Sequence, residues 1–264
     1  MKKMLNIKMN RPIKMNRPPF IEKFDAVGNW DVTRLTEDLK NLVSATGCDW
    51  DEWSRFNKIT STKFSNSIIH QGVGSGNINL TCNLNLSKTL DEQLWNYSGR
   101  RYHETIQVDH SDLHTLNPAL RGTYTEKLYH KLVEKLGPVY MRIHNKEEHG
   151  LYWHKDISYG YSLGNFRYHI TLWTNPGHFL VWTEDDMPWE KGVQPEHTTT
   201  PYTINSVYLP VTGDCYKLAT GHYVHGVSSI GIGYESSNEI ESRCHIVVVP
   251  IRPYNRHSTY VPLR

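Results

Sequence analysis

The sequence predicts a mainly β domain of the jelly-roll or barrel type, in which N-terminal helices support the β core. The second half of the chain is a series of short runs rich in β-branched and aromatic residues, separated by Gly, Pro, Asn and Asp. The first half contains two segments with helical periodicity. No Pro/Gly/Ser-rich linker divides the halves, and 264 residues are enough for one such domain.

The first 18 residues differ from the rest of the chain. The hexapeptide IKMNRP occurs at 7–12 and again at 13–18, which is too short and too few for a solenoid repeat. This segment carries positive charge but no apolar stretch, so it does not read as a secretory signal. We expect a flexible N-terminal arm over 1–18 and a single domain over 19–264, with helical support at 19–137 and the β core at 138–252.

Two helices are expected in the supporting part. In residues 30–46 the apolar positions recur at helical spacing, and Asp31 or Thr33 can serve as the N-cap. The clearer helix is 123–137, where leucines recur at every fourth position and Gly137 ends the pattern. Both helices therefore have one apolar face that can pack on a sheet.

After Gly137 the pattern is that of strands, whereas the polar, Asn- and Ser-rich segment 51–100 gives no assignment. Short apolar runs bounded by turn-forming residues indicate strands that are buried in a sandwich or barrel. Seven runs are predicted as strands: VYMRIH (139–144), FRYHITLW (166–173), HFLVW (178–182), NSVYLP (205–210), CYKLA (215–219), YVHGVS (223–228) and CHIVVVPI (244–251).

Charge and cysteine content exclude several classes of protein. The 29 Lys and Arg residues against 27 Asp and Glu give a net charge of only +2, which argues against a dedicated nucleic-acid or membrane surface. No apolar run approaches the ~20 residues needed to cross a bilayer. The cysteines are scattered without a C-x-x-C pair, so we expect reduced thiols in a cytoplasmic protein rather than metal ligands. They are Cys48, Cys82, Cys215 and Cys244.

Three residues form the pattern of a metal site. His154 and Asp156 lie two positions apart in WHKD, so on an extended segment both side chains point to the same face. His225 lies in a later strand-like run and is the expected third ligand, while His222 is the competing candidate at an odd separation from it. Two imidazoles and one carboxylate leave three coordination positions of an iron open, as in non-haem Fe(II) oxygenases.

Two strand-like runs carry the pattern Arg-x-His. Arg167 with His169, and Arg243 with His245, each place two basic side chains on one face of a strand and apolar side chains on the other. Such a strand is ordinarily half exposed to solvent. Inside a barrel, the same pattern would form a cationic lumen suited to a dicarboxylate, because a guanidinium binds a carboxylate with two hydrogen bonds. Finding the pattern twice favours the lumen.

Residues 138–250 resemble the Fe(II)/2-oxoglutarate-dependent dioxygenases, and among them the aspartyl/asparaginyl β-hydroxylase and free-proline hydroxylase group. The similar segments are VYMRIH, WHKD, RYHITL, and YVHGVSSIG followed by SRCHIVVV. The resemblance implies a double-stranded β-helix, which is a cupin-like jelly roll. It also implies that His154, Asp156 and His225 hold Fe(II).

The same resemblance assigns the co-substrate site. It implies that Arg243 binds the distal carboxylate of 2-oxoglutarate and that Arg167 and His169 contact this co-substrate from the opposite strand. The chain departs from the animal aspartyl β-hydroxylases, which lack a carboxylate ligand, because Asp156 is present here as in the bacterial proline hydroxylases. The loop between the last ligand and Arg243 is also long for the group.

The expected activity is hydroxylation of an aliphatic C–H bond of an amino acid, free or within a peptide, of the Asp, Asn or Pro kind. Dioxygen and 2-oxoglutarate would be consumed, with release of succinate and CO2, and no catalytic residue beyond the metal ligands is assigned. Two alternatives remain open from the sequence. One is a cupin-like metal-dependent enzyme that does not use 2-oxoglutarate, and the other is a non-enzymatic β-sandwich binding module with structural histidines. The expected partner is a small molecule or peptide, without nucleic acid or membrane.

Overall fold

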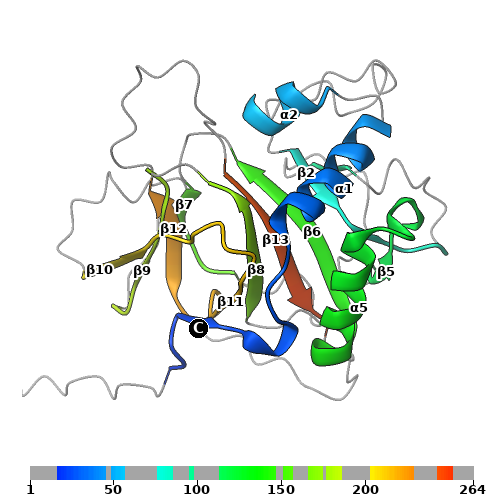
Figure 1. The fold of residues 1–264 in the computed structure, drawn as a ribbon. Helices are drawn as coiled ribbons and strands as arrows, with labels where there is room; N and C mark the ends of the chain where they lie inside the picture. Colours follow the sequence, from blue (N-terminus) through cyan, green and yellow to red (C-terminus); the bar gives the residue numbers. More distant parts are fainter. Residues whose placement is uncertain are drawn as a thin grey trace, which may run out of the picture.

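A computed structural model of the chain describes residues 17–45, 49–56, 76–85, 95–97, 113–146, 151–156, 166–174, 177–185, 203–228 and 243–251. These residues form a mainly β fold with helices on one side (Figure 1). Every pair of neighbouring strands is antiparallel. The helices and 3-10 turns are η1 (Asp25–Val27), α1 (Val32–Ala45), α2 (Trp50–Phe56), η5 (Pro118–Leu120) and α5 (Tyr124–Leu136).

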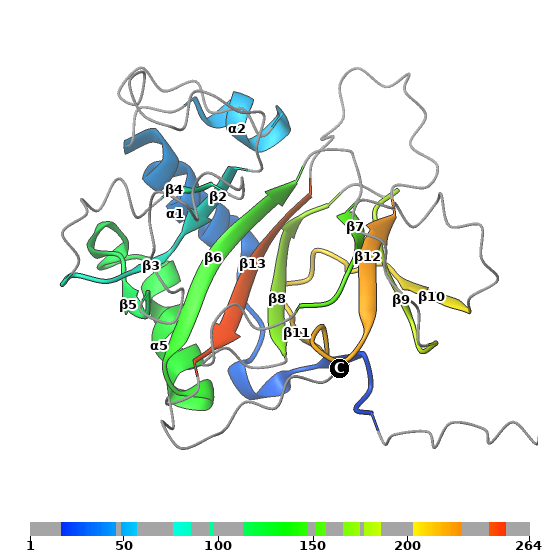
Figure 2. The ribbon, with the colours of Figure 1, turned by 180° about the vertical axis from the view of Figure 1, so that it is seen from behind.

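The strands form two large sheets and one small one. The major sheet has seven strands in the order β1-β11-β8-β13-β6-β2-β4, the minor sheet has four in the order β10-β9-β12-β7, and β3 pairs with β5. In Figure 2 the minor sheet stands beside the major one, away from the helices. The strands are β1 (Ile21–Lys23), β2 (Gly76–Asn79), β3 (Thr81–Cys82), β4 (Trp95–Tyr97), β5 (Thr115–Leu116), β6 (Val139–Lys146), β7 (Leu151–His154), β8 (Arg167–Trp173), β9 (Phe179–Thr183), β10 (Ile204–Val207), β11 (Cys215–Leu218), β12 (Val224–Ser228) and β13 (Arg243–Pro250).

The predicted mainly β class is confirmed, and each of the seven predicted runs contains a strand. Both predicted helices are present as α1 and α5. The first half of the chain does more than supply helices, because β1, β2 and β4 extend the major sheet at its two edges. The described strands form separate sheets and do not close into a barrel.

The helices cover one face of the major sheet and bury the largest apolar cluster. Alternate residues of its central strands, such as Met141 on β6 and Ile170 on β8, meet the leucines of α1 and α5 there. Leu35 and Leu128 have 1% and 0% of their surfaces exposed. A fully buried leucine stabilises a fold by about 1.5–3 kcal/mol relative to an exposed one. The apolar stripe of each helix thus fixes which face of the sheet it covers.

Side-chain capping fixes the two long helices against each other. Asp31, one of the two proposed N-caps, accepts a hydrogen bond from the backbone N–H of Arg34 through its Oδ1 at 3.2 Å. In α5 the Thr123 hydroxyl accepts from the backbone N–H of Glu126 at 3.3 Å. Asp38 of α1 accepts from both the N–H and the hydroxyl of Thr125, at 2.6 and 2.8 Å. One helix therefore satisfies a free N–H at the start of the other.

A second apolar cluster joins the two large sheets. Leu218 of β11 in the major sheet packs there with Leu180 and Val227 of the minor sheet. Phe20, which lies just before β1, belongs to the same cluster and has 4% of its surface exposed. The space between the sheets is therefore filled by apolar side chains beside β1 and β11.

The last two residues of the expected N-terminal arm contact the folded domain. The hydroxyl of Tyr223 donates a hydrogen bond to the carbonyl of Pro18 at 2.6 Å. Nη1 of Arg17 donates to the carbonyl of Glu184 at 3.2 Å. Residues 1–16 lie outside the described part of the chain.

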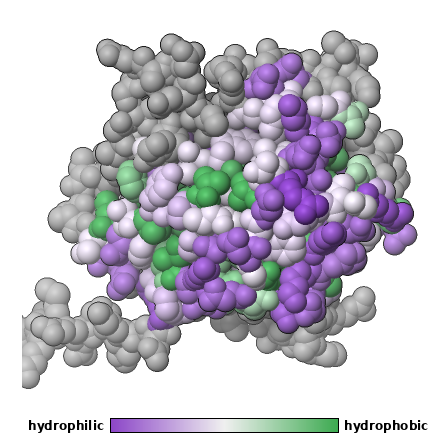
Figure 3. All heavy atoms as spheres, in the orientation of Figure 1, coloured by the Kyte–Doolittle hydropathy of each residue, from purple (hydrophilic) through white to green (hydrophobic). Residues whose placement is uncertain are grey.

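The face shown in Figure 3 carries hydrophilic side chains over much of its described area, with hydrophobic residues in small groups between them. Within the described residues, no helix is both long enough and apolar enough to cross a bilayer. Cys82, Cys215 and Cys244 are buried free thiols, and Cys48 lies outside the described residues.

Candidate metal centre

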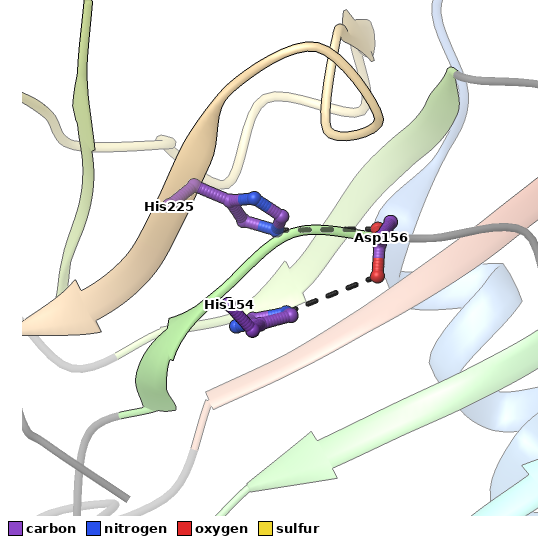
Figure 4. A group of neighbouring side chains, drawn as sticks. All are labelled: His154, Asp156 and His225. Atoms are coloured by element: carbon purple, nitrogen blue, oxygen red, sulfur yellow. Dashed lines mark ion pairs between the residues drawn. The ribbon is translucent and has the colours of Figure 1, made fainter. Parts of the chain in front are cut away.

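His154, Asp156 and His225 come together at one end of the minor sheet, as Figure 4 shows. Their potential ligand atoms all lie within 4.8 Å of one another. Nε2 of His154 is 3.8 Å from Oδ1 of Asp156, and Nε2 of His225 is 3.9 Å from Oδ2. Nitrogen and carboxylate donors spaced in this way can hold a divalent transition metal. The two-apart pair and the distant histidine predicted from the sequence thus form one group.

Strand pairing brings these three residues together. His154 is the last residue of β7, and it lies directly opposite His225 of β12 in the antiparallel register. The centres of the two imidazole rings are 4.3 Å apart. Asp156 follows the end of β7, and its backbone N–H donates a hydrogen bond to the carbonyl of Thr220 at 3.2 Å. The turn that precedes β12 therefore fixes the carboxylate beside both imidazoles.

A backbone contact sets which nitrogen of His225 faces the group. Nδ1 of His225 lies 3.1 Å from the carbonyl oxygen of Tyr223, which can only accept a hydrogen bond. Nδ1 therefore carries the proton, and Nε2 presents its lone pair toward Asp156. A metal-binding histidine is commonly oriented by such a hydrogen bond from its other ring nitrogen.

An arginine of the major sheet reaches the carboxylate of this group. Nε of Arg167, on β8, is 3.5 Å from Oδ2 of Asp156. Burial opposes ionisation of Asp156, but Arg167 and the two histidines together outweigh it and hold the pKa of this carboxyl well below its usual value. Asp156 is therefore an anion at neutral pH, as a metal ligand must be.

The face of the major sheet opposite the helices carries a polar layer beside the triad. Arg167 and His169 of β8 lie on this face, as do Arg243 and His245 of β13, while the alternate residues of both strands pack against the helices. Nδ1 of His245 is 3.3 Å from the hydroxyl of Thr171. β13 is buried along almost its whole length, and on β8 Arg167 is buried while His169 is half-buried. The two Arg-x-His patterns therefore face the interior of the protein rather than bulk solvent.

Arg243 is a buried cation of this layer. It has 8% of its surface exposed, and its Nη1 lies 3.5 Å from Nε2 of His245. Among the described residues it forms no ion pair with a carboxylate. Burial lowers the pKa of Arg243 to about 10, so the guanidinium stays charged at neutral pH. Burial of a cation without an anion beside it is costly, so this position is suited to an anionic ligand.

Three histidines around the centre, His169, His225 and His245, are neutral at neutral pH. Burial, together with the charge of Arg243, lowers the pKa of His169 to about 3. Burial and the neighbouring His154 lower the pKa of His225 to about 4. The pKa of His245 is also far below its usual value, again mainly because of burial. At neutral pH these side chains can bind metal or ligand without first losing a proton.

A third Arg-x-His pattern, which was not predicted from the sequence, lies on β6. Arg142 and His144 alternate with Met141 and Ile143, which face the helices, so they lie on the polar face. The register places Arg142 opposite Val247 of β13, which in turn lies opposite His169 of β8. The repeated pattern in MRIH was the signal that could have revealed this residue.

His222, the competing ligand candidate, lies away from the centre. His222 is not part of the group of ligand atoms, and its ring lies 5.5 Å from that of Phe166. A register shift on β13 leaves Leu172 as an extra residue in β8, after which Trp173 packs toward the helices beside Trp50. Trp182, in contrast, lies directly opposite His225 in the minor sheet.

Comparisons with known proteins add little. No family model matches the chain. No curated protein matches it either. Among solved structures, the crystal structure of AviO1 from Streptomyces viridochromogenes Tue57 is similar at 14% identity, over 88% of this chain and 87% of that chain, with a TM-score of 0.36. At that TM-score the likeness establishes neither a shared fold nor a shared activity.

Proposed function

We propose that the chain is an Fe(II)- and 2-oxoglutarate-dependent dioxygenase that hydroxylates an aliphatic C–H bond of an amino acid. One observation carries the proposal: the His–Asp–His group lies beside a buried layer that contains Arg243, a cation without a carboxylate partner among the described residues. A metal and a separate buried cation suit a ligand that chelates at one end and carries a carboxylate at the other. 2-Oxoglutarate has this form.

The strand connections support a double-stranded β-helix. Along the chain, β6, β8, β11 and β13 lie in the major sheet, while β7, β9, β10 and β12 lie in the minor sheet. Eight antiparallel strands that pass between two sheets in this way are typical of a jelly roll. In this interpretation β1, β2 and β4 are additions to the major sheet, and the metal group lies between the sheets.

Each residue of the site has a distinct role in the proposal. His154, Asp156 and His225 would hold iron and leave three positions for the co-substrate and dioxygen. Bound iron and 2-oxoglutarate would supply the oxidising chemistry: one atom of dioxygen would enter the C–H bond and the other would enter succinate, with loss of CO2. Arg167 orients the carboxylate of Asp156 through the contact at 3.5 Å. Arg243 binds the distal carboxylate of 2-oxoglutarate.

The surroundings of the centre favour this activity over the two alternatives. A cupin-like enzyme without 2-oxoglutarate does not require the buried guanidinium of Arg243, which forms no ion pair with a carboxylate among the described residues. A binding module with structural histidines does not require three donor atoms to converge, or one of them to be held as an anion by Arg167. Neutral His169 fits beside a bound dicarboxylate because it adds no further charge.

Turnover with matched histidine variants tests the proposal. Fe(II) protein incubated with 2-oxoglutarate, dioxygen and a panel of amino acids and short peptides should form succinate together with a product heavier by one oxygen atom. His225→Ala should abolish both iron binding and turnover, whereas His222→Ala, a neighbouring histidine outside the group, should retain both. Succinate-free turnover, or iron binding that depends on His222, would contradict the assignment.

A further inference from the structure

Arg142 of β6 occupies the polar face of the major sheet one strand beyond Arg243. Across this face the register runs from Arg142 through Val247 to His169. Neighbouring strands in a sheet lie about 4.8 Å apart, so the backbones that carry Arg142 and His169 are separated by roughly 10 Å.

No anion in the described structure compensates Arg142. Its Nε is buried and has no hydrogen-bond partner. Its guanidinium carbon lies 6.0 Å from the ring centre of Tyr140, whose hydroxyl donates to Oδ1 of Asn79 at 2.6 Å. Among the described residues, no carboxylate forms an ion pair with Arg142. A shielded donor without a partner requires an explanation, and a bound ligand is one.

In the proposed complex, the negative groups do not balance the charge of Arg142. The metal and the three arginines bring five positive charges to this layer, namely two on the metal and one each on Arg142, Arg167 and Arg243. Asp156 and the two carboxylates of 2-oxoglutarate offset three of them. His169 feels the charge of Arg142 as well as that of Arg243, so these groups share one electrostatic environment. Two positive charges remain, and a carboxylate of the substrate would offset one of them.

We propose that Arg142 binds a carboxylate of the substrate, so the substrate is a free amino acid or another small carboxylic acid rather than a residue inside a peptide. This inference rests on the proposed function and narrows its substrate class. Arg243 is more deeply buried than the half-buried Arg142, which suits a co-substrate that binds first and a substrate that binds later. A single planar guanidinium matches a carboxylate with two hydrogen bonds.

The test compares acids with their amides. Anaerobic Fe(II) protein with 2-oxoglutarate is titrated with the twenty L-amino acids, with small mono- and dicarboxylic acids, and with the C-terminal carboxamide of each amino acid. Binding is followed by perturbation of the metal-to-2-oxoglutarate absorption band and by equilibrium dialysis. At least one free acid should bind at least tenfold more tightly than its amide. Arg142→Gln should weaken that acid about 100-fold, the loss of a charge-assisted bidentate contact.

Two further variants separate the possible outcomes. Arg142→Lys, which keeps the charge but not the planar fork, should recover part of the affinity, and the exposed Arg34→Gln should change nothing. The Kd of 2-oxoglutarate should stay within about twofold in all three proteins. If Arg142→Gln weakens 2-oxoglutarate instead of the acid, if amides or internal peptide residues bind as well as acids, or if no carboxylic acid binds, the inference is wrong.

The experiment also distinguishes failure of the dioxygenase proposal from failure of the carboxylate site at Arg142. In that case the wild-type protein gives no absorption band with 2-oxoglutarate, and the acids and amides are compared by equilibrium dialysis alone. A preference for acids that disappears in Arg142→Gln would still support a carboxylate site at Arg142. Equal binding of acids and amides, or no binding, would overturn it.

Discussion

Phe20 connects the two large sheets directly behind His225, a proposed metal ligand, so its substitution tests the centre and the core together. Its ring stacks on Trp182 at 4.6 Å, meets Tyr223 edge-on at 5.5 Å, and lies 5.9 Å from the ring of His225. Its carbonyl accepts a hydrogen bond from Ala219 at 2.7 Å. Because Tyr223 also supplies the carbonyl that orients His225, a cavity at Phe20 should disturb the metal centre as well as the core.

The size of the effect follows from burial. Phe20 has 4% of its surface exposed, and truncation of a buried phenylalanine to alanine costs about 3–5 kcal/mol. For a protein of this size, 1 kcal/mol corresponds to roughly 2–4 °C in Tm, so Phe20→Ala should lower Tm by about 6–20 °C. Loss of a contact that orients a metal-binding side chain typically weakens metal affinity about 10- to 100-fold. We expect Phe20→Ala to weaken metal affinity by a factor in that range.

The assay is a Co(II) titration followed by visible absorption, beside thermal unfolding of the metal-free protein. Phe24→Ala is the matched control, because Phe24 packs edge-on against Tyr168 at 4.9 Å on the helix-covered side of the sheet. It should lower Tm without changing the Co(II) affinity. Equal Co(II) affinity in Phe20→Ala and wild type, at a temperature where both are folded, would refute the link between Phe20 and the centre.

Two further predictions concern the metal-free protein. The pKa of His225 is lowered to about 4 and that of His169 to about 3, against about 6.5 when unfolded, so the unfolded state binds more protons below pH 6.5. The free energy of unfolding contributed by these neutral histidines is therefore complete above pH 6.5. It falls by on the order of 3 kcal/mol for each histidine as the pH drops toward 4. A free energy of unfolding, measured with denaturant, that is independent of pH between 7 and 4 would contradict this. In Gly213→Ala the new Cβ would lie 1.8 Å from the carbonyl oxygen of Trp30, whereas in Gly122→Ala, where the φ is also positive, no atom lies within 4 Å. Gly213→Ala should therefore lose about 1–3 kcal/mol more of the free energy of unfolding than Gly122→Ala. Equal unfolding midpoints would show that the contact with Trp30 relaxes freely.

The sequence was sufficient for the strands of the second half because their local composition and their pairing agree. The run around Val247 is buried on both sides of its strand and reads as continuous β structure. Part of the candidate metal site could also be predicted from the sequence. His154 and Asp156 are two residues apart, and on an extended segment this spacing places both side chains on the same face. The distant His225 could be proposed only from its place in a strand-like run.

Other features depend on non-local pairing and left no comparable local signal. The strands β2 and β4 come from a polar segment and exist as strands at the free edge of the major sheet, where β2 pairs with β6. Nothing local shows that β13 lies between β8 and β6, yet that order places Arg243 and Arg142 in one layer. The bulge at Leu172, which turns Trp173 toward the helices, likewise depends on the partner strand.

The most direct test of the central claim is anaerobic addition of 2-oxoglutarate to the Fe(II) protein, monitored by visible absorption. A charge-transfer band should appear, saturate at about one co-substrate per chain, and be absent in His225→Ala. In Arg243→Ala the 2-oxoglutarate concentration for half-saturation should rise ~100-fold, since a charge-assisted bidentate contact of ~3 kcal/mol is lost. Tight Fe(II) binding without any band would contradict the account and favour a metal-dependent enzyme that does not use 2-oxoglutarate.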